Sequence, residues 1–166
     1  MTAIEIRTGA PGDLTALRRL FRRSSLSVEA FREALLADPE ALELSDTAVA
    51  EGRTRVAVAA DGAIVGFITF LPLGALVLEL EDLFVDPDRM RQGVARQLVD
   101  DLTTAAKRDG ITSIEVTANP YAVAFYRSVG FVHMRDTDTK FGPAPRMRLL
   151  LADDGAAGAI QHAGLS

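Results

Sequence analysis

Apolar and polar residues follow one another along the chain in patterns that predict both strands and helices. Alternation and β-branched residues predict strands at residues 4–7, 55–59, 64–70, 76–85, 111–117, 131–135 and 147–151. Apolar residues at helical spacing predict helices over residues 14–21, 28–36, about 93–108 and 119–129. This order of strands and helices is typical of a mixed α/β fold.

Turn and capping residues mark the ends of several of these elements. Asp13 suits the N-cap of the first helix, and Pro39 interrupts the second. Asp61 and Gly62 form a dipeptide that is typical of a tight hairpin. Gly110 suits the C-cap of the long helix. These residues divide the chain into short elements without a repeat or an obvious linker.

Length and composition indicate one folded domain. The chain has 166 residues, of which 48% are hydrophobic, and this is enough for an ordinary core. We expect a single domain over residues 1–151. Residues 152–166 are rich in Gly and Ala, and we expect a flexible tail there.

Charge and residue usage exclude several classes of function. The net charge of −5 argues against nucleic acid as a partner. The sequence has no cysteine and only two histidines, His133 and His162, so we expect no disulfide, no Cys nucleophile and no metal site. No signal peptide and no apolar run of membrane-spanning length is present. We therefore expect a cytoplasmic protein without a membrane partner.

The stretch from residue 83 to residue 99, LFVDPDRMRQGVARQLV, is the first that indicates chemistry. A strand ends at Val85, a loop follows, and a helix begins just after Gly93. The unpaired backbone N–H groups at a helix start favour an anion such as a pyrophosphate. Arg89, Arg91 and Arg96 add positive charge, although a basic helix entrance with a glycine turn is the alternative. Neither the Walker A pattern nor the dinucleotide fingerprint is present.

This stretch resembles motif A of the GNAT acetyltransferase superfamily. The motif is an apolar strand reading L-x-V-x-P, followed by [RQ]-x-x-G-x-[GA]. Leu83, Val85 and Pro87 match its first part, and Gly93 and Ala95 match its second. Met90 stands where the family has Arg or Gln, so a side-chain contribution is lost there while the backbone N–H remains.

A second stretch, residues 111–131, resembles motif B of the same superfamily. The motif reads N-x-x-A-x-x-[FL]-Y-x-x-x-G-F after a strand, and the residues that match it are Asn119, Ala122, Phe125, Tyr126, Gly130 and Phe131. The resemblance covers roughly residues 64–150. It implies a GNAT-like mixed sheet that is splayed at its centre, with about six to seven strands and about four flanking helices.

The resemblance also implies that acetyl-CoA is the cofactor, with its pantetheine arm pairing like an added strand between the splayed strands. The residues expected to contact coenzyme A are Leu83, Phe84, Val85, Met90, Arg91, Gln92, Gly93, Val94, Ala95, Arg96, Asn119, Phe125 and Tyr126. Asn119 and Tyr126 would lie two turns apart on one face of a single helix.

Acetyl transfer to an amine needs a base for the amine, and the departing thiolate can use a proton. The resemblance gives Tyr126 the role of proton donor, and the alternative is a buried tyrosine whose hydroxyl is satisfied. Glu79 and Glu81 are candidate bases, because some family members carry a catalytic Glu at the position of Glu79. An ordered water could replace them, and both could equally be a solvated acidic edge. Asp82 is the weaker candidate.

The expected function is therefore transfer of an acetyl or other acyl group from acetyl-CoA to a primary amine, by direct attack in a ternary complex. A small-molecule amine is the expected acceptor. Acetylation of a protein N-terminus or lysine, and a catalytically inactive acyl-CoA-binding module, remain alternatives. The arginines of the first predicted helix, Arg18, Arg19, Arg22 and Arg23, form either a solvated face or a site for an acidic acceptor. The resemblance leaves a homodimer open.

Overall fold

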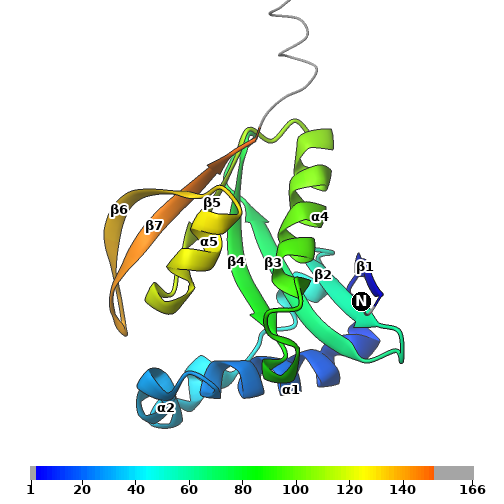
Figure 1. Ribbon diagram of the computed structural model, residues 1–166, viewed down its shortest axis with the longest axis vertical. Coiled ribbons are helices and arrows are strands. Elements are labelled where there is room, and N and C mark those ends of the chain that lie inside the picture. Colours follow the sequence, from blue (N-terminus) through cyan, green and yellow to red (C-terminus); the bar gives the residue numbers. More distant parts are fainter. Residues whose placement is uncertain (1–2, 152–166) are drawn as a thin grey trace, which may run out of the picture. The chain divides into compact units, whose positions relative to one another are not determined.

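Seven strands and five α-helices make up the part of the chain that the computed structural model describes, residues 3–151 (Figure 1). The strands follow the hydrogen-bonded order β1-β2-β3-β4-β5-β7-β6. This architecture confirms the mixed α/β class. The tail predicted for residues 152–166 lies outside the described residues. Over residues 3–151, none of the helices has the length and apolar character that crossing a bilayer requires.

The described residues form two compact units, and each is treated by itself. Unit 1 contains those of Met1–Leu71 together with Leu80–Leu102. Unit 2 contains Pro72–Glu79 together with those of Thr103–Ser166. The chain passes from one unit to the other at the last residue of β3, within β4 and within α4. The single-domain expectation for residues 1–151 stays a prediction.

Unit 1 is built from antiparallel strands and the N-terminal helices. Its elements are β1 (Ile4–Thr8), α1 (Leu14–Leu26), α2 (Glu29–Leu36), α3 (Thr47–Ala50), β2 (Thr54–Ala59), most of β3 (Ile64–Pro72), most of β4 (Val77–Val85) and the first part of α4 (Val94–Arg108). Short 3₁₀ turns cover Pro11–Asp13, Pro39–Leu42 and Pro87–Arg89. β2 pairs antiparallel with both β1 and β3.

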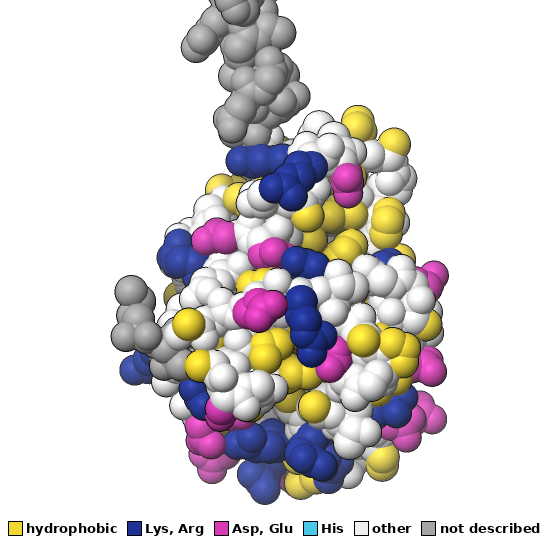
Figure 2. All heavy atoms as spheres, turned by 90° about the vertical axis from the view of Figure 1, so that its right-hand side faces the viewer, with side chains coloured by type: hydrophobic (Ala, Val, Ile, Leu, Met, Phe, Trp, Pro, Cys, Tyr) yellow, Lys and Arg dark blue, Asp and Glu magenta, His cyan; other side chains and the backbone are white. Residues whose placement is uncertain are grey.

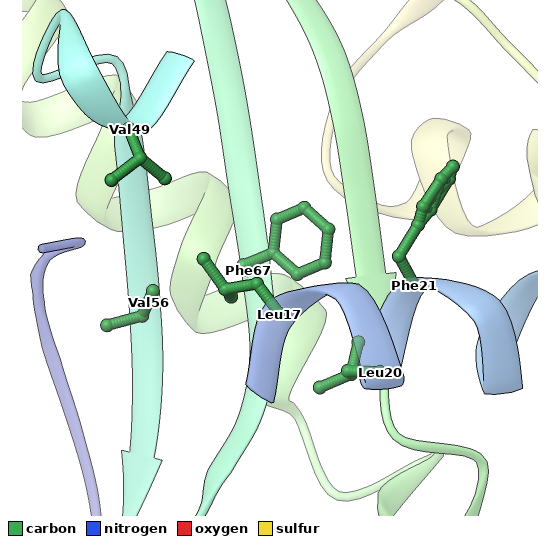
Figure 3. Packing of buried hydrophobic residues seen from close by; sticks show 6 residues of the cluster. All are labelled: Leu17, Leu20, Phe21, Val49, Val56 and Phe67. Atoms are coloured by element: carbon green, nitrogen blue, oxygen red, sulfur yellow. The ribbon is translucent and has the colours of Figure 1, made fainter. Parts of the chain in front are cut away.

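Helices cover both faces of the strands in unit 1. Leu17, Leu20 and Phe21 of α1 pack against Val56 of β2 and Phe67 of β3 in one buried cluster (Figure 3). The neighbouring residue Gly66 faces the other way, because a Cβ there would lie 2.9 Å from Val94 Cγ1 and 3.2 Å from Leu98 Cδ1. Successive strand residues point to opposite faces, so α1 and α4 lie on opposite faces of β3.

Unit 2 is built around a three-stranded antiparallel sheet. Its elements include β5 (Ser113–Thr117), α5 (Val123–Ser128), β6 (Val132–Thr139) and β7 (Gly142–Leu150). β7 pairs with β5 on one side and with β6 on the other. Ile114, Val116 and Met147 are almost fully buried on one face of these strands. Glu115 and Thr117 of β5 and their partners Arg148 and Arg146 of β7 lie on the opposite face.

The structure corrects two local predictions. Asp13 does not cap α1 with its side chain; its carboxylate instead accepts hydrogen bonds from Arg7 and from the Ala10 N–H. The hydrogen bonds from Arg7 lower the pKa of Asp13 despite partial burial. The helix predicted over residues 119–129 is wrong as a continuous helix. Pro120–Ala122 is a 3₁₀ turn, and α5 covers only Val123–Ser128.

Candidate active site

The loop between β4 and α4 has the backbone geometry of an anion site. Arg91 has a φ of 64° and Gly93 a φ of 82°, both in the left-handed region. The first α-helical hydrogen bond runs from Gln97 N–H to the Gly93 carbonyl. The N–H groups of Val94 and Ala95 precede this bond and therefore have no partner within the helix. Left-handed residues and a helix N-terminus together form a concave set of donors that suits a phosphate.

Space is open where an anion would approach this loop. A Cβ built on Gly93 meets no atom within 4 Å. Figure 2 shows Lys and Arg side chains gathered at the lower end of the face it presents, the level at which Figure 1 shows α1 and the loop before α4. Arg89, Arg91 and Arg96 belong to that loop and the first turn of α4. The side chain of Met90 is 58% exposed, so it is not part of the core.

Contacts from β3 and α1 hold the loop in place. Asp86 N–H donates to the Val65 carbonyl at 2.8 Å, and the Asp86 carboxylate accepts from Asp88 N–H. Arg23 of α1 donates to Asp86 at 3.0 Å and to Asp88 at 3.2 Å. Arg23 was expected in a solvated or acceptor-binding patch, and the structure uses it to join α1 to the loop. Only its positive charge was visible in the sequence.

The β4 residues that were expected beside the cofactor differ in how far their side chains are exposed. The ring of Phe84 packs between Phe21 at 4.9 Å and Phe67 at 5.7 Å, measured between ring centroids. Val85 is buried, whereas Leu83 is partly exposed. The Phe84 side chain is partly buried and packs against the core of unit 1.

Glu81 and Asp82 lie in unit 1 with different partners. Glu81 accepts from Arg53 at 2.7 Å, and Arg53 also binds Glu51. Asp82 accepts from the Thr69 hydroxyl at 2.6 Å. Burial raises the pKa of Asp82, the charge of Glu81 adds to this, and the Thr69 hydrogen bond opposes it. Asp82 is thus the β4 carboxylate for which the environment favours the protonated form.

Glu79 lies in unit 2 and is held by an arginine that the motifs do not mark. Arg146 of β7 donates to both carboxylate oxygens of Glu79, with Nη1 2.6 Å from Oε2. It also donates to Glu115 at 3.1 Å and to Thr117 at 3.0 Å. The hydrogen bond to Glu79, more than burial, determines the shift that raises the pKa of Arg146. Glu115 was missed, because an isolated Glu in a strand carries no signal of its partner.

The motif B residues also lie in unit 2. The Asn119 Oδ1 accepts from Tyr121 N–H at 2.9 Å, which leaves its amide N–H groups as donors for a ligand. Tyr126 is buried on α5, with its ring 5.3 Å from Phe125 and 5.2 Å from Phe131. The 3₁₀ turn between Asn119 and α5 removes the argument that Asn119 and Tyr126 share one α-helical face.

Comparisons with known proteins identify the family. The family model described as an acetyltransferase (GNAT) domain matches residues 22–148. The chain therefore belongs to the GNAT acetyltransferases, which confirms the predictions of an acetyltransferase and of acetyl-CoA as the acyl donor. No curated protein matches the chain at a significant level.

Solved structures agree on the fold. An N-acetyltransferase named PaiA from Thermoplasma acidophilum, in complex with coenzyme A, has a TM-score of 0.73 and 21% identity over 89% of this chain and 99% of its own. The ribosomal-protein-S18-alanine N-acetyltransferase from Escherichia coli has a TM-score of 0.67 and 22% identity over 90% and 95%. A nourseothricin acetyltransferase has a TM-score of 0.68 and 23% identity over 91% and 100%. The TM-scores establish a common fold, and at these low identities the comparison is limited to the fold.

Proposed function

We propose that this enzyme transfers the acetyl group of acetyl-CoA to the primary amine of a small molecule, by direct attack in a ternary complex. The observation that carries the cofactor half of the proposal is the loop before α4, where Arg91 and Gly93 are both left-handed and a helix begins directly after them. No atom lies within 4 Å of the Gly93 Cβ position, so a phosphate has open space to approach the backbone at this residue.

Acetyl-CoA supplies an activated acetyl thioester, and the roles proposed for the chain follow from its residues. In unit 1, the backbone from Arg91 to Arg96 binds phosphate oxygens, and the strand backbone at 83–85 offers groups for an amide-bearing arm. In unit 2, the side-chain amide of Asn119 offers N–H donors to a ligand. Glu79 takes the proton that the amine loses as its nitrogen forms the new bond to carbon. Tyr126 donates a proton to the sulfur as the carbon–sulfur bond breaks.

Glu79 is preferred as the base over Glu81 and Asp82 because of how it is held. Arg146 fixes both of its oxygens, so its direction is defined by two hydrogen bonds rather than one. Glu81 shares Arg53 with Glu51. Asp82 is mostly enclosed and bound to Thr69. As an alternative, a water molecule bound to one of these carboxylates takes the proton from the amine.

The acceptor in this proposal is a small amine rather than a protein. Two structural neighbours illustrate the range, since one is described as acting on the alanine of a ribosomal protein and the other on nourseothricin. Retention of Tyr126 and of a fixed carboxylate favours an active enzyme over a module that only binds acyl-CoA.

One experiment distinguishes an enzyme that acetylates small amines from one that acetylates peptides and from an inactive acyl-CoA-binding module. Coenzyme A release from acetyl-CoA is followed with a panel of small amines, N-terminal peptides and lysine peptides, beside calorimetry with coenzyme A. We expect binding of coenzyme A and turnover with small amines. Turnover with peptides alone would replace the acceptor, binding without any turnover would support the inactive module, and absence of binding would overturn the cofactor assignment.

A further inference from the structure

Two arginines lie two residues apart on one face of β7, and their surroundings differ. Arg146 is the cross-strand partner of Thr117, and Arg148 is the partner of Glu115. Residues two apart on a strand point the same way, with Cα atoms roughly 7 Å apart. Both side chains therefore lie on the polar face of unit 2, opposite the face that buries Ile114, Val116 and Met147.

Arg146 binds acceptors from three residues on this face. It binds both oxygens of Glu79, the Oε1 of Glu115 and the hydroxyl of Thr117. The side chains of Arg146, Glu79 and Glu115 are largely buried, with 12% of the Arg146 side chain and 18% of each glutamate side chain exposed. Glu115, the direct cross-strand neighbour of Arg148, is thus paired with the other arginine.

Arg148 is left with a buried donor that has no acceptor. Its Nε is buried and makes no hydrogen bond, and no ion pair with a described carboxylate holds its guanidinium. Burying an N–H of a charged group without an acceptor is unfavourable, and a guanidinium forms its strongest contacts with a planar carboxylate. The chain itself does not provide that carboxylate within the described residues.

The charges of this face also leave room for an anion. Glu79 and Glu115 face Arg146 and Arg148, and the partner of Arg146 on β6 is a further arginine, Arg135. The arginines therefore outnumber the carboxylates in this group. The excess is positive although the whole chain has a net charge of −5.

We propose that Arg148 binds a carboxylate of the acceptor, so that the substrate class is an amine that also carries a carboxylate. The amine end would lie at Glu79 and the acid end at Arg148. The short distance between Arg146, which holds Glu79, and Arg148 suits a compact molecule such as an amino acid. This inference rests on the proposed function, because it uses Glu79 as the group that meets the amine.

The test uses matched acceptors that differ only at the acid group. Each standard amino acid is offered as the free acid and as its carboxamide, with acetyl-CoA, to the full-length enzyme. At least one free acid should be acetylated with a KM at least tenfold below that of its amide. Arg148→Gln should raise the KM of the acid by tenfold or more and leave the amide almost unchanged, which removes the discrimination.

Controls keep the outcomes distinct. Arg127→Gln changes an exposed arginine of α5 and should leave both acceptors unaffected. Arg148→Lys keeps the charge without the planar fork, and should recover part of the preference if Arg148→Gln folds poorly. Amides as good as acids, an unchanged preference in Arg148→Gln, or no free acid that is either acetylated or bound would each overturn the inference. Loss of coenzyme A binding by the unchanged enzyme would instead count against the proposed function.

Discussion

Arg146 on β7 holds Glu79 on β4 through both oxygens of its carboxylate, across 67 residues of sequence. The same guanidinium binds Glu115, so one cation separates two carboxylates. Both glutamates depend on that charge, because like charges at close range disfavour each other. The arrangement makes Arg146 a positioning residue for the proposed base.

Replacing Arg146 should therefore lower turnover more than it weakens cofactor binding. In Arg146→Gln, the carboxylate of Glu79 loses the two hydrogen bonds that fix its direction. We expect kcat to fall by roughly 10- to 100-fold while the affinity for coenzyme A is kept, because the proposed base is then no longer held in one position. Arg146→Lys should recover part of the loss.

The matched control for Arg146 is Arg53→Gln, which removes the partner of Glu81. If Glu79 is the base, this variant keeps its turnover. A loss of turnover in Arg53→Gln but not in Arg146→Gln would transfer the role to Glu81. Coenzyme A affinity, measured for both variants, shows whether either change acts on the cofactor instead.

Asp82 should reduce stability at neutral pH. Its pKa is raised by burial in the folded state, so the folded protein holds its proton to higher pH than the unfolded chain does. Stability is therefore lost as pH rises above the unfolded pKa, and the loss is complete above the folded pKa. Asp82→Asn keeps an acceptor for Thr69 and removes this penalty.

We expect Asp82→Asn to raise Tm at pH 7, with the gain disappearing as pH is lowered toward the unfolded pKa of about 3.9. In a domain of this size, each 1 kcal/mol corresponds to roughly 2–4 °C. Thermal unfolding from pH 4 to pH 8 measures the trend, and an unchanged Tm at every pH would contradict it. Loss of turnover in this variant would make Asp82 the base.

Gly66 is expected to resist even the smallest side chain. A Cβ there would lie 2.9 Å from Val94 Cγ1 and 3.1 Å from the Phe84 carbonyl oxygen. Gly66→Ala should lower the free energy of unfolding by about 1–3 kcal/mol, as overpacked cores do. Gly12→Ala is the control, because no atom lies within 4 Å of its Cβ position. Urea denaturation compares the two, and equal stabilities would mean that α4 moves away freely.

Alanine substitutions at Gly93 and Gly52 together separate the effect of backbone strain on stability from an effect on cofactor binding. Both have positive φ, 82° and 74°, and open space at the Cβ position. An alanine at either should cost roughly 1–2 kcal/mol of stability. Only Gly93→Ala should weaken coenzyme A binding, by tenfold or more in calorimetry, because its methyl group lies where the phosphate approaches. A similar loss of affinity in Gly52→Ala would show that lower stability is the cause.

Tyr126→Phe should lower turnover and spare binding. Phe keeps the ring contacts with Phe125 and Phe131, and only the hydroxyl is lost. A positioned general acid contributes about 10²–10⁴-fold, and we expect the lower end because a thiolate leaves readily. Turnover and coenzyme A affinity are measured together with unfolding. Equal turnover would remove the catalytic role, and a parallel loss of stability would assign the hydroxyl to the core.

The sequence predicted the long and regular elements well. Residues 64–70 are rich in β-branched and aromatic residues and lie within β3, and the helix ending at Arg108 lies where Gly110 indicated. Short elements were missed or merged, such as α3 and the 3₁₀ turn at Pro120, because four or fewer residues carry too little periodicity. Asp13 was misplaced because Arg7 competes for its carboxylate.

The site was predictable where a motif is local and unpredictable where it depends on pairing between distant strands. The loop from Met90 to Gly93 could be read directly, because glycine and helix start are adjacent in the chain. The joining of Glu79 and Glu115 by Arg146 depends on strand order and register, which periodicity does not specify. The ion pairs of Arg23 were not predicted for the same reason, since its partners Asp86 and Asp88 lie more than 60 residues away.

The left-handed backbone of Arg91 has a consequence for how this enzyme could evolve or be engineered. A residue with a Cβ is held there against its own preference, at a φ of 64°. Glycine at this position would relax the turn and raise thermal stability, but it would remove a positive charge beside the proposed phosphate site. Thermal stability and affinity for acetyl-CoA therefore favour different residues at position 91, and selection for heat tolerance alone would lower the affinity of the loop for the cofactor.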